Sequence, residues 1–537
     1  MNAAREHLPV DDNAGWVLLL PAPRPDTRLL CLELGTTRFA EGAAFWFDDV
    51  TALNVHAQGE THFSNGSLSS ETPRAWIPGV KLPFESQSFA VVVCRLAGSG
   101  AGHEALDVLL PELARVLSAG GAVYFDVDNP GSYQSRGQRA GCRRGSLDKR
   151  LARAGFIHRR HHAQIFENGR LWEVIPPGGY RASRNAWRTR ERLKELLLGR
   201  LTQRWFAPVH GVLAARSPLA SSALDELPAM RATENPRLMQ FLVNPGKCFV
   251  AGEAPASALP LITVVPTRAD TITRRRTELA ALERLQGARL PVTRLLPRVS
   301  REVDHGRHPV FEYEAFAGTT IDLPTPDFDA CMERAFRILC DFNRSSLECR
   351  ALTAAEVDML VTRPLNIAAQ RYPETATEAA RLRAALEATL VGAIVPVSWQ
   401  HGDYKLENLV FGGPERSVRA IIDWELSAPQ GLALVDLLYL LAYAEITLGA
   451  EVDILPVVRN GMLGDRWRPA SRALLDRYTR EFPQVIPFRN ACIGLFLVHH
   501  VAIRFAYDAR DFNSHSVMAE LMLNIAARLE MSAEPHK

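Results

Sequence analysis

The feature that most constrains this chain is a polar segment, residues 399–425, that contains two short apolar runs. The runs at 409–411 and 420–422 are separated by a turn signal, Gly-Gly-Pro, at 412–414. Apolar runs of this length on both sides of a Gly/Pro turn predict a pair of short antiparallel strands. We therefore expect the pairing to bring the polar residues before and after these strands close together.

Three of these polar residues suit the transfer of a phosphoryl group. Asp403 and Asn408 come from one tight loop before the first strand, and Asp423 follows the second strand. The reaction needs a carboxylate that accepts the proton of the attacking hydroxyl, and oxygen ligands that hold magnesium against the phosphates. The loop aspartate, the asparagine five residues later and the second aspartate supply these groups.

The same segment resembles the catalytic loop of the aminoglycoside phosphotransferase and choline kinase family, which has a protein-kinase-like fold. That family shows His-Gly-Asp, four variable residues, Asn, and then a strand that ends in Asp, and this sequence has all of these elements. The resemblance implies that ATP and Mg²⁺ are the cofactors. It assigns Asp403 as catalytic base, and Asn408 and Asp423 as magnesium ligands.

The resemblance gives roles to three further residues around this loop. His401 would brace the loop from its first position. Lys405 lies where protein kinases also have a lysine, and it would steady the transferring phosphate. Asp436 lies in the segment that resembles the family's helix after the metal site, where it would organise the catalytic loop rather than touch substrate.

The preceding segment, residues 236–325, resembles the family's nucleotide-binding lobe in part. The apolar run Leu261–Val265 predicts a strand, and Thr273–Leu285 has the spacing of a helix. These two stand in the family's order. Glu278 matches the family's helical glutamate, or Glu283 does in a shifted register.

The lysine that the family carries on this strand is missing from the sequence. Arg268 or Lys247 would have to replace it in space. The strand that contains Glu312, Tyr313 and Glu314 resembles the hinge that receives adenine on its backbone. Because the missing lysine removes a phosphate contact, a pseudokinase scaffold that does not bind nucleotide with magnesium stays open as an alternative.

The first part of the chain, residues 25–175, has an α/β pattern. Strand-like apolar runs precede a segment, 105–117, whose leucines recur at helical spacing. Gly120-Gly121 is expected to break the chain after this helix, before a strand at 122–127. Helix, turn and strand in this order predict a parallel sheet.

This part resembles a class I, S-adenosylmethionine-dependent methyltransferase with a degraded cofactor site. Where that family has an acidic residue and then Gly-x-Gly-x-Gly, only Glu33 and Gly35 match, and Thr37 and Phe39 add bulk. Glycines are needed there because the backbone must approach the cofactor closely. The resemblance implies a structural or substrate-presenting domain. S-adenosylmethionine, with Glu33 as its first contact, stays open as a further cofactor.

The length and charge of the chain limit the possible number of domains and the classes of binding partner. A chain of 537 residues is too long for one hydrophobic core. The formal net charge of +2 predicts no affinity for nucleic acid. No apolar run reaches the roughly 18 residues that span a bilayer, so we expect a cytoplasmic protein without a membrane span.

The expected fold is α/β plus α+β: a Rossmann-like, methyltransferase-type domain followed by a two-lobed, protein-kinase-like domain. We expect the first at 1–180, a basic helical region and linker at 181–235, and the two lobes at 236–325 and 326–537. The predicted function is phosphorylation of a hydroxyl of a small molecule or sugar. The alternatives are a pseudokinase scaffold and a bifunctional methyltransferase–kinase that acts on a glycan; the oligomeric state is left open.

Overall fold

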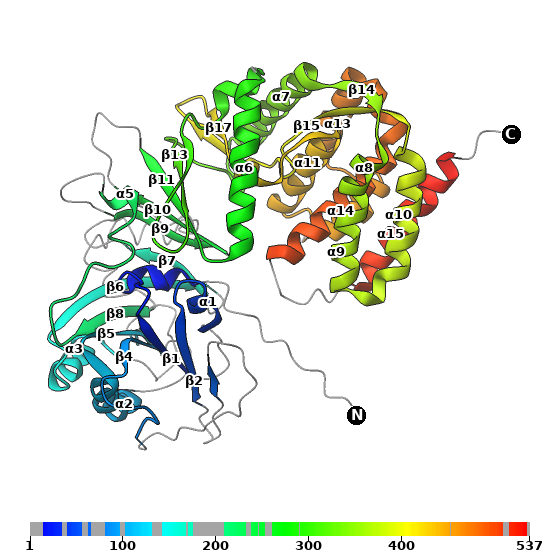
Figure 1. Ribbon diagram of the computed structural model, residues 1–537. Helices are drawn as coiled ribbons and strands as arrows, with labels where there is room; N and C mark the ends of the chain where they lie inside the picture. Colours follow the sequence, from blue (N-terminus) through cyan, green and yellow to red (C-terminus); the bar gives the residue numbers. More distant parts are fainter. Residues whose placement is uncertain are drawn as a thin grey trace. The chain divides into compact units, whose positions relative to one another are not determined.

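The computed structural model divides into two compact units (Figure 1). Unit 1 comprises Met1–Thr273 and Arg301–Glu314, and unit 2 comprises Arg274–Ser300 and Ala315–Lys537. The structure describes residues 14–34, 40–55, 63–65, 81–96, 103–130, 142–167, 170–175, 209–231, 238–244, 246–252, 260–288, 290–451, 453–507 and 515–533.

Unit 1 is built on one mixed sheet, which has 13 strands among the described residues, in the order β12-β13-β11-β10-β9-β7-β6-β8-β5-β4-β1-β2-β3 (Figure 1). The strands are β1 (Arg28–Leu34), β2 (Asp49–Val55), β3 (Phe63–Asn65), β4 (Phe89–Arg95), β5 (Leu117–Asp128), β6 (His158–Glu167), β7 (Arg170–Ile175), β8 (Val209–Ala215), β9 (Leu238–Asn244), β10 (Lys247–Gly252), β11 (Leu261–Pro266), β12 (Ser300–Val303) and β13 (Val310–Glu314). The described helices of this unit are η1 (Ala14–Leu19), α1 (Ala40–Ala44), α2 (His103–Val116), α3 (Arg144–Arg153) and α5 (Pro228–Arg231).

The predicted parallel sheet is confirmed in the part that contains β2, β1, β4 and β5, which pair in parallel. The predicted break at Gly120-Gly121 is wrong, because β5 begins directly after α2, at Leu117. The two glycines lie in an irregular stretch, where the pairing with β4 jumps from Leu117 to Ala122. Glycine in a strand commonly marks such a bulge, so the pair that was expected to end an element interrupts its register instead.

A strand lies where the sequence was expected to give a linker. Residues 209–215 form β8, which pairs with both β5 and β6 and is buried along its whole length. The run Val-His-Gly-Val-Leu-Ala-Ala is apolar enough for a central strand, so the linker prediction fails there. The arginine-rich part at 181–208 lies outside the described residues.

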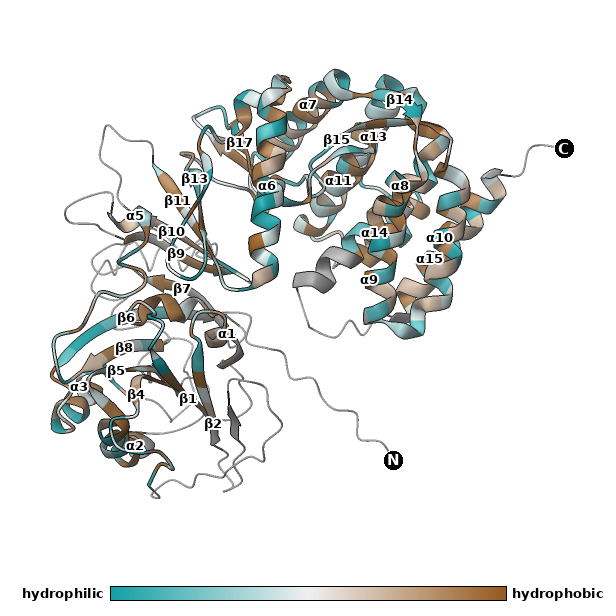
Figure 2. Cartoon of the chain, in the orientation of Figure 1, coloured by the Kyte–Doolittle hydropathy of each residue, from teal (hydrophilic) through white to brown (hydrophobic). Residues whose placement is uncertain are grey.

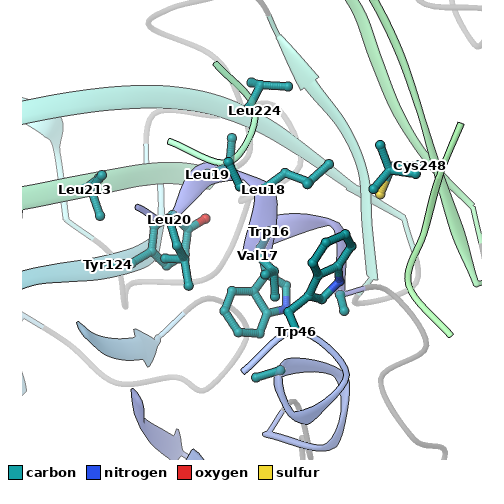
Figure 3. Packing of buried hydrophobic residues seen from close by; sticks show 14 of the residues in the cluster. Trp16, Val17, Leu18, Leu19, Leu20, Trp46, Tyr124, Leu213, Leu224 and Cys248 are labelled. Atoms are coloured by element: carbon teal, nitrogen blue, oxygen red, sulfur yellow. The ribbon is translucent and has the colours of Figure 1, made fainter. Parts of the chain in front are cut away.

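One hydrophobic core joins the first strands of unit 1 to β10 and β11. The short helix η1 is fully buried, and Trp16 stacks on Tyr124 of β5 with ring centroids 6.4 Å apart. The same cluster includes Trp46 and Cys248 (Figure 3). A hairpin lies at Asn244, since β9 and β10 pair in antiparallel fashion around it.

Helix α6 (Ala269–Gly287) crosses from unit 1 into unit 2, which begins at Arg274. Unit 2 is mainly helical, and its helices mix hydrophobic and hydrophilic residues (Figure 2). Its described sheets are β14-β15-β18 and the pair β16-β17. The elements are α7 (Phe328–Ser346), β14 (Glu348–Ala351), α8 (Ala354–Val357), α9 (Arg363–Arg371), α10 (Ala376–Leu390), β15 (Ile394–Gln400), β16 (Leu409–Gly412), β17 (Ser417–Ile421), β18 (Ala428–Leu432), α11 (Val435–Thr447), α12 (Ile454–Pro456), α13 (Pro469–Glu481), α14 (Arg489–Tyr507) and α15 (His515–Ala533).

Across the described ranges, no helix is both long enough and apolar enough to cross a membrane. Helix α11 is buried along most of its length, yet it carries Asp436 in its first turn. Its apolar residues therefore pack inside unit 2.

Candidate active site

The polar segment of unit 2 is organised by the strand pair that the sequence predicts. Strands β16 and β17 pair in antiparallel fashion, with Leu409 opposite Ile421. One residue further, the Ile422 amide donates to the carbonyl oxygen of Asn408 at 2.9 Å. Asn408 and Asp423 therefore lie at the same end of the pair.

The loop before β16 is fixed by the buried carboxylate of Asp436. The backbone amides of His401 and Gly402 donate to its two oxygens at 2.7 and 2.9 Å. The His401 ring contacts the carbonyl oxygen of Ile422 through Nε2 at 2.9 Å. Burial raises the pKa of Asp436, although the His401 charge and the two amides act in the opposite direction.

Gly402 is required by the shape of this loop. Its φ is +82°, in the left-handed region, and an added Cβ would lie 2.4 Å from the carbonyl oxygen of Leu426. A backbone oxygen cannot move aside as a flexible side chain can. The His-Gly-Asp order therefore has a steric reason as well as a chemical one.

Asp403 lies between an amide and an ammonium group. Asn408 Nδ2 donates to its Oδ2 at 3.0 Å and to its backbone oxygen at 2.8 Å. Lys405 Nζ lies 2.9 Å from the same Oδ2. The Asp403 side chain keeps 18% of its surface exposed, so it is held in place without being sealed from solvent.

Lys405 is surrounded by groups that favour its charged form. Its Nζ lies 3.5 Å from Glu407 Oε2 and 4.3 Å from the centroid of the Tyr443 ring. Burial lowers the pKa of Lys405, but Asp403, Tyr443 and Glu407 together raise it by more. Lys405 therefore carries a positive charge directly beside Asp403.

A second group of charges lies where α6 meets the residues after β17, and we call it the Arg275 cluster. It consists of Arg275, Glu278, Asp423 and Glu425. Arg275 Nη1 donates to Glu278 at 2.6 Å, and Nη2 donates to Asp423 at 3.0 Å and also to Glu425. Arg275, Glu278 and Glu425 are buried, whereas the Asp423 side chain is 32% exposed.

The residues predicted from the sequence fall into two groups. His401, Asp403, Lys405, Asn408, Asp423 and Glu278 come together in unit 2. The other proposed nucleotide contacts belong to unit 1. Arg268 donates hydrogen bonds to Asp270 at 3.0 and 3.1 Å, and the buried Glu312 accepts a hydrogen bond from Arg301 at 2.7 Å. Tyr313 and Glu314 are buried in β13.

Sequence reasoning missed Arg275. It considered Arg268 and Lys247 as the cation that replaces the missing lysine, whereas Arg275 contacts Glu278 directly. The one available signal was the spacing, since Arg275 precedes Glu278 by three residues and such pairs face each other on a helix. In the methyltransferase-like part, the Glu33 side chain and residues 35–39, which include Gly35, Thr37 and Phe39, lie outside the described structure.

The residues present fit a magnesium ion better than a softer metal. Asn408 uses its amide nitrogen on Asp403, so its amide oxygen is the atom suited to a metal, and Asp423 adds a partly exposed carboxylate. In the described part of the chain, no group of three or more His, Cys, Asp or Glu residues could hold a metal. Magnesium is usually held by one or two protein oxygens together with substrate phosphates, so a sparse set of this kind is sufficient.

Comparisons with known proteins point to one family for part of the chain. Residues 251–469 match the family model described as "Phosphotransferase enzyme family". No curated protein matches the chain.

Several solved structures are similar to the chain over about half of its length. The ADP-bound aminoglycoside phosphotransferase APH(2'')-Ib has 14% identity over 54% of this chain and 93% of its own, with a TM-score of 0.35. Choline kinase LicA from Streptococcus pneumoniae has 16% identity over 53% and 90%, with a TM-score of 0.35. Aminoglycoside phosphotransferase APH(3'')-Id from Streptomyces rimosus, in complex with ADP and streptomycin, has 13% identity over 47% and 90%, with a TM-score of 0.32.

Proposed function

We propose that this protein is an ATP- and magnesium-dependent phosphotransferase that phosphorylates a hydroxyl of a small molecule or sugar. The observation that carries the proposal is the environment of Asp403, a partly exposed carboxylate held by Asn408 and Lys405. The match of residues 251–469 to the phosphotransferase family model supports the same reaction class. As part of the proposal, the methyltransferase-like domain spans 1–180 and the two kinase-like lobes span 236–325 and 326–537, whereas the stretch 181–235 contains strand β8 and is not wholly a linker.

Asp403 acts as the base in this proposal. Both side-chain contacts described above fall on its Oδ2, so we assign Oδ1 to the acceptor hydroxyl. Oδ1 would accept the hydroxyl proton as the new O–P bond forms and the bond between the γ-phosphorus and the oxygen of the leaving ADP breaks. Lys405 places a positive charge beside the carboxylate and next to the incoming phosphate. His401 acts indirectly: its ring and its backbone amide tie the loop to Ile422 and Asp436.

Asn408, through its amide oxygen, and Asp423, through its carboxylate, are the residues that would hold magnesium. When bound, the ion supplies charge neutralisation for the phosphates. Both residues are set by the backbone bond between Ile422 and Asn408, so their spacing does not depend on the substrate. Glu278, Arg268 and the β13 residues Glu312, Tyr313 and Glu314 are the proposed nucleotide contacts.

The first part of the chain has a proposed supporting role as a methyltransferase-like domain that is structural or presents the substrate. The parallel order of β2, β1, β4 and β5 supports a Rossmann-like arrangement. Specific binding of S-adenosylmethionine to the full chain, measured by calorimetry, would instead support the bifunctional alternative. Absence of binding leaves the kinase proposal as stated.

The test of the kinase is transfer of a radiolabelled γ-phosphate from ATP to a panel of aminoglycosides, choline and free sugars. We expect one class of acceptor to become labelled in the presence of Mg²⁺ and the label to disappear with Asp403→Asn. The control is Asp341→Asn, an exposed aspartate of the same unit that pairs with Arg344. Labelling that survives Asp403→Asn would contradict the assigned base.

A further inference from the structure

Arg275 has no part in the mechanism proposed above, yet its contacts converge on a residue that does. Its guanidinium contacts the carboxylates of Glu278, Asp423 and Glu425. The Arg275 side chain is only 3% exposed, so these contacts form away from bulk solvent. Asp423, one of the three partners, is the proposed magnesium ligand.

In the Arg275 cluster, one guanidinium brings three carboxylates together. Buried like charges repel strongly, because little water screens them. A planar guanidinium can bond several carboxylates at once, which a lysine ammonium does less well. Arg275 therefore holds together three groups that would otherwise move apart.

The backbone of Asp423 also needs support. Its φ of +67° and ψ of +55° place it in the left-handed region, which residues other than glycine adopt only when their surroundings hold them there. On one side Ile422 donates to Asn408. On the other side the Trp424 amide donates to Glu278 Oε1 at 2.9 Å, while the other oxygen of Glu278 receives Arg275. Arg275 thus contacts Asp423 directly and also holds the glutamate that anchors the next residue.

We propose that Arg275 is a positioning residue for the magnesium site: from α6 it orients the carboxylate of Asp423 toward the metal. The inference rests on the proposed function, because it needs a metal at Asp423. Hydrogen-bonded partners of metal ligands fix ligand orientation, and their loss typically weakens metal binding by about 10–100-fold. Arg275 would act in this way without touching the ion or the substrate.

The experiment measures binding of Mn²⁺, a spectroscopic substitute for Mg²⁺, by the full-length protein with ATP, using electron paramagnetic resonance. We expect Arg275→Met to weaken Mn²⁺ binding by about 10–100-fold. Arg275→Lys keeps the charge but not the planar contacts, so we expect it to fall between Arg275→Met and the wild type. Asp423→Ala marks the full loss of the site.

The matched control is Arg95→Met. Arg95 is also a buried arginine in an ion pair, with Asp126 in unit 1, and its side chain is 7% exposed. This variant loses a comparable buried contact, so we expect lower thermal stability and unchanged Mn²⁺ binding. If Arg275→Met fails to fold, as judged by circular dichroism, the comparison of Arg275→Lys with wild type decides the question.

The outcomes separate the two proposals. If wild type and Asp423→Ala bind Mn²⁺ equally, the proposed metal site is wrong and the inference fails with it. If binding depends on Asp423 but the Arg275 variants bind as well as Arg95→Met does, the metal site stands and Arg275 is merely structural. Tighter binding by Arg275→Met would also overturn the inference, because the guanidinium would then compete with the metal.

Discussion

Two buried arginines, one in each unit, occupy contrasting electrostatic settings. In unit 1, Arg95 Nε lies 2.7 Å from Asp126 Oδ2, and the two side chains are 7% and 1% exposed. In unit 2, Arg275 is equally buried but contacts three carboxylates, one of which is partly exposed. The first contact joins one guanidinium to one carboxylate, and the second joins one guanidinium to three carboxylates.

The difference separates a structural ion pair from a cluster that includes the proposed magnesium ligand. A buried ion pair compensates its own charge but still needs hydrogen bonds for its remaining polar atoms. Arg95 and Asp126 lie opposite each other near the carboxyl ends of β4 and β5, the edge at which open α/β sheets usually bind ligands. Unit 1 therefore places an ion pair near an edge that often binds a cofactor, whereas unit 2 joins three carboxylates, the proposed magnesium ligand Asp423 among them, through one arginine.

The largest expected effect tests this division of roles. Asp403→Asn removes the proposed base, so we expect phosphoryl transfer to fall by about 10²–10⁴-fold. Asp126→Asn changes a buried aspartate outside the proposed site, and we expect the rate per folded molecule to stay at the wild-type value. Rates with a labelled acceptor, normalised to folded protein, check both. Equal losses in the two variants would remove the contrast between the units.

Breaking the ion pair of unit 1 should lower the stability of the protein. Arg95→Met removes the guanidinium from the buried Asp126 carboxylate, and we expect the free energy of unfolding to fall by about 3–5 kcal/mol. Arg95→Met combined with Asp126→Leu removes both charges and should recover most of that loss. Arg28→Met, in the exposed pair with Asp49, serves as control and should leave denaturant unfolding unchanged. A double variant no more stable than Arg95→Met would contradict the explanation.

Acid should weaken unit 1 through two buried histidines. Burial, and to a smaller extent nearby positive charge, lowers the pKa of both His162 and His210 to about 4. The unfolded chain binds these protons near pH 6.5, so stability falls as the pH drops from 6.5 toward 4, by roughly 3 kcal/mol for each group. In His162→Gln and His210→Gln, the free energy of unfolding should therefore change less with pH across this range. Unchanged slopes would show that the two rings are not buried as neutral groups.

The smallest expected effect separates local strain from damage to the site. Gly392 has φ +74° with nothing near an added Cβ, so Gly392→Ala should cost only about 1–2 kcal/mol and leave activity unchanged. Gly402→Ala adds the clash with Leu426 and should also abolish Mg²⁺-dependent ATP binding. Thermal unfolding and calorimetry on both variants make the comparison. An active Gly402→Ala enzyme would show that the loop does not need its present shape.

The local parts of the molecule were predictable from the sequence. The strand pair β16–β17 and the hairpin at Asn244 follow from apolar runs around turn residues, which are short-range signals. Asp403 and Asn408 could be predicted as neighbours because only four residues of one loop lie between them. The roles assigned to these residues stay predictions, because they concern chemistry rather than placement.

Other features could not be predicted, because they depend on residues that lie far apart in the sequence. The Arg275 cluster joins residues 148 and 150 positions apart, which no local pattern reveals. Strand β8 was read as linker because its partners, β5 and β6, precede it in the chain and the segment is short. The Gly120-Gly121 pair looked like a break because glycine favours both turns and bulges, and only the pairing with β4 decides between them.

The most direct test of the kinase is calorimetric titration of ATP, with and without Mg²⁺, into the wild type and Asp423→Ala. We predict that the wild type binds ATP more tightly with Mg²⁺, and that Asp423→Ala loses only this magnesium-dependent part. Failure of both proteins to bind ATP would contradict the account and favour a scaffold that has kept the loop without its chemistry.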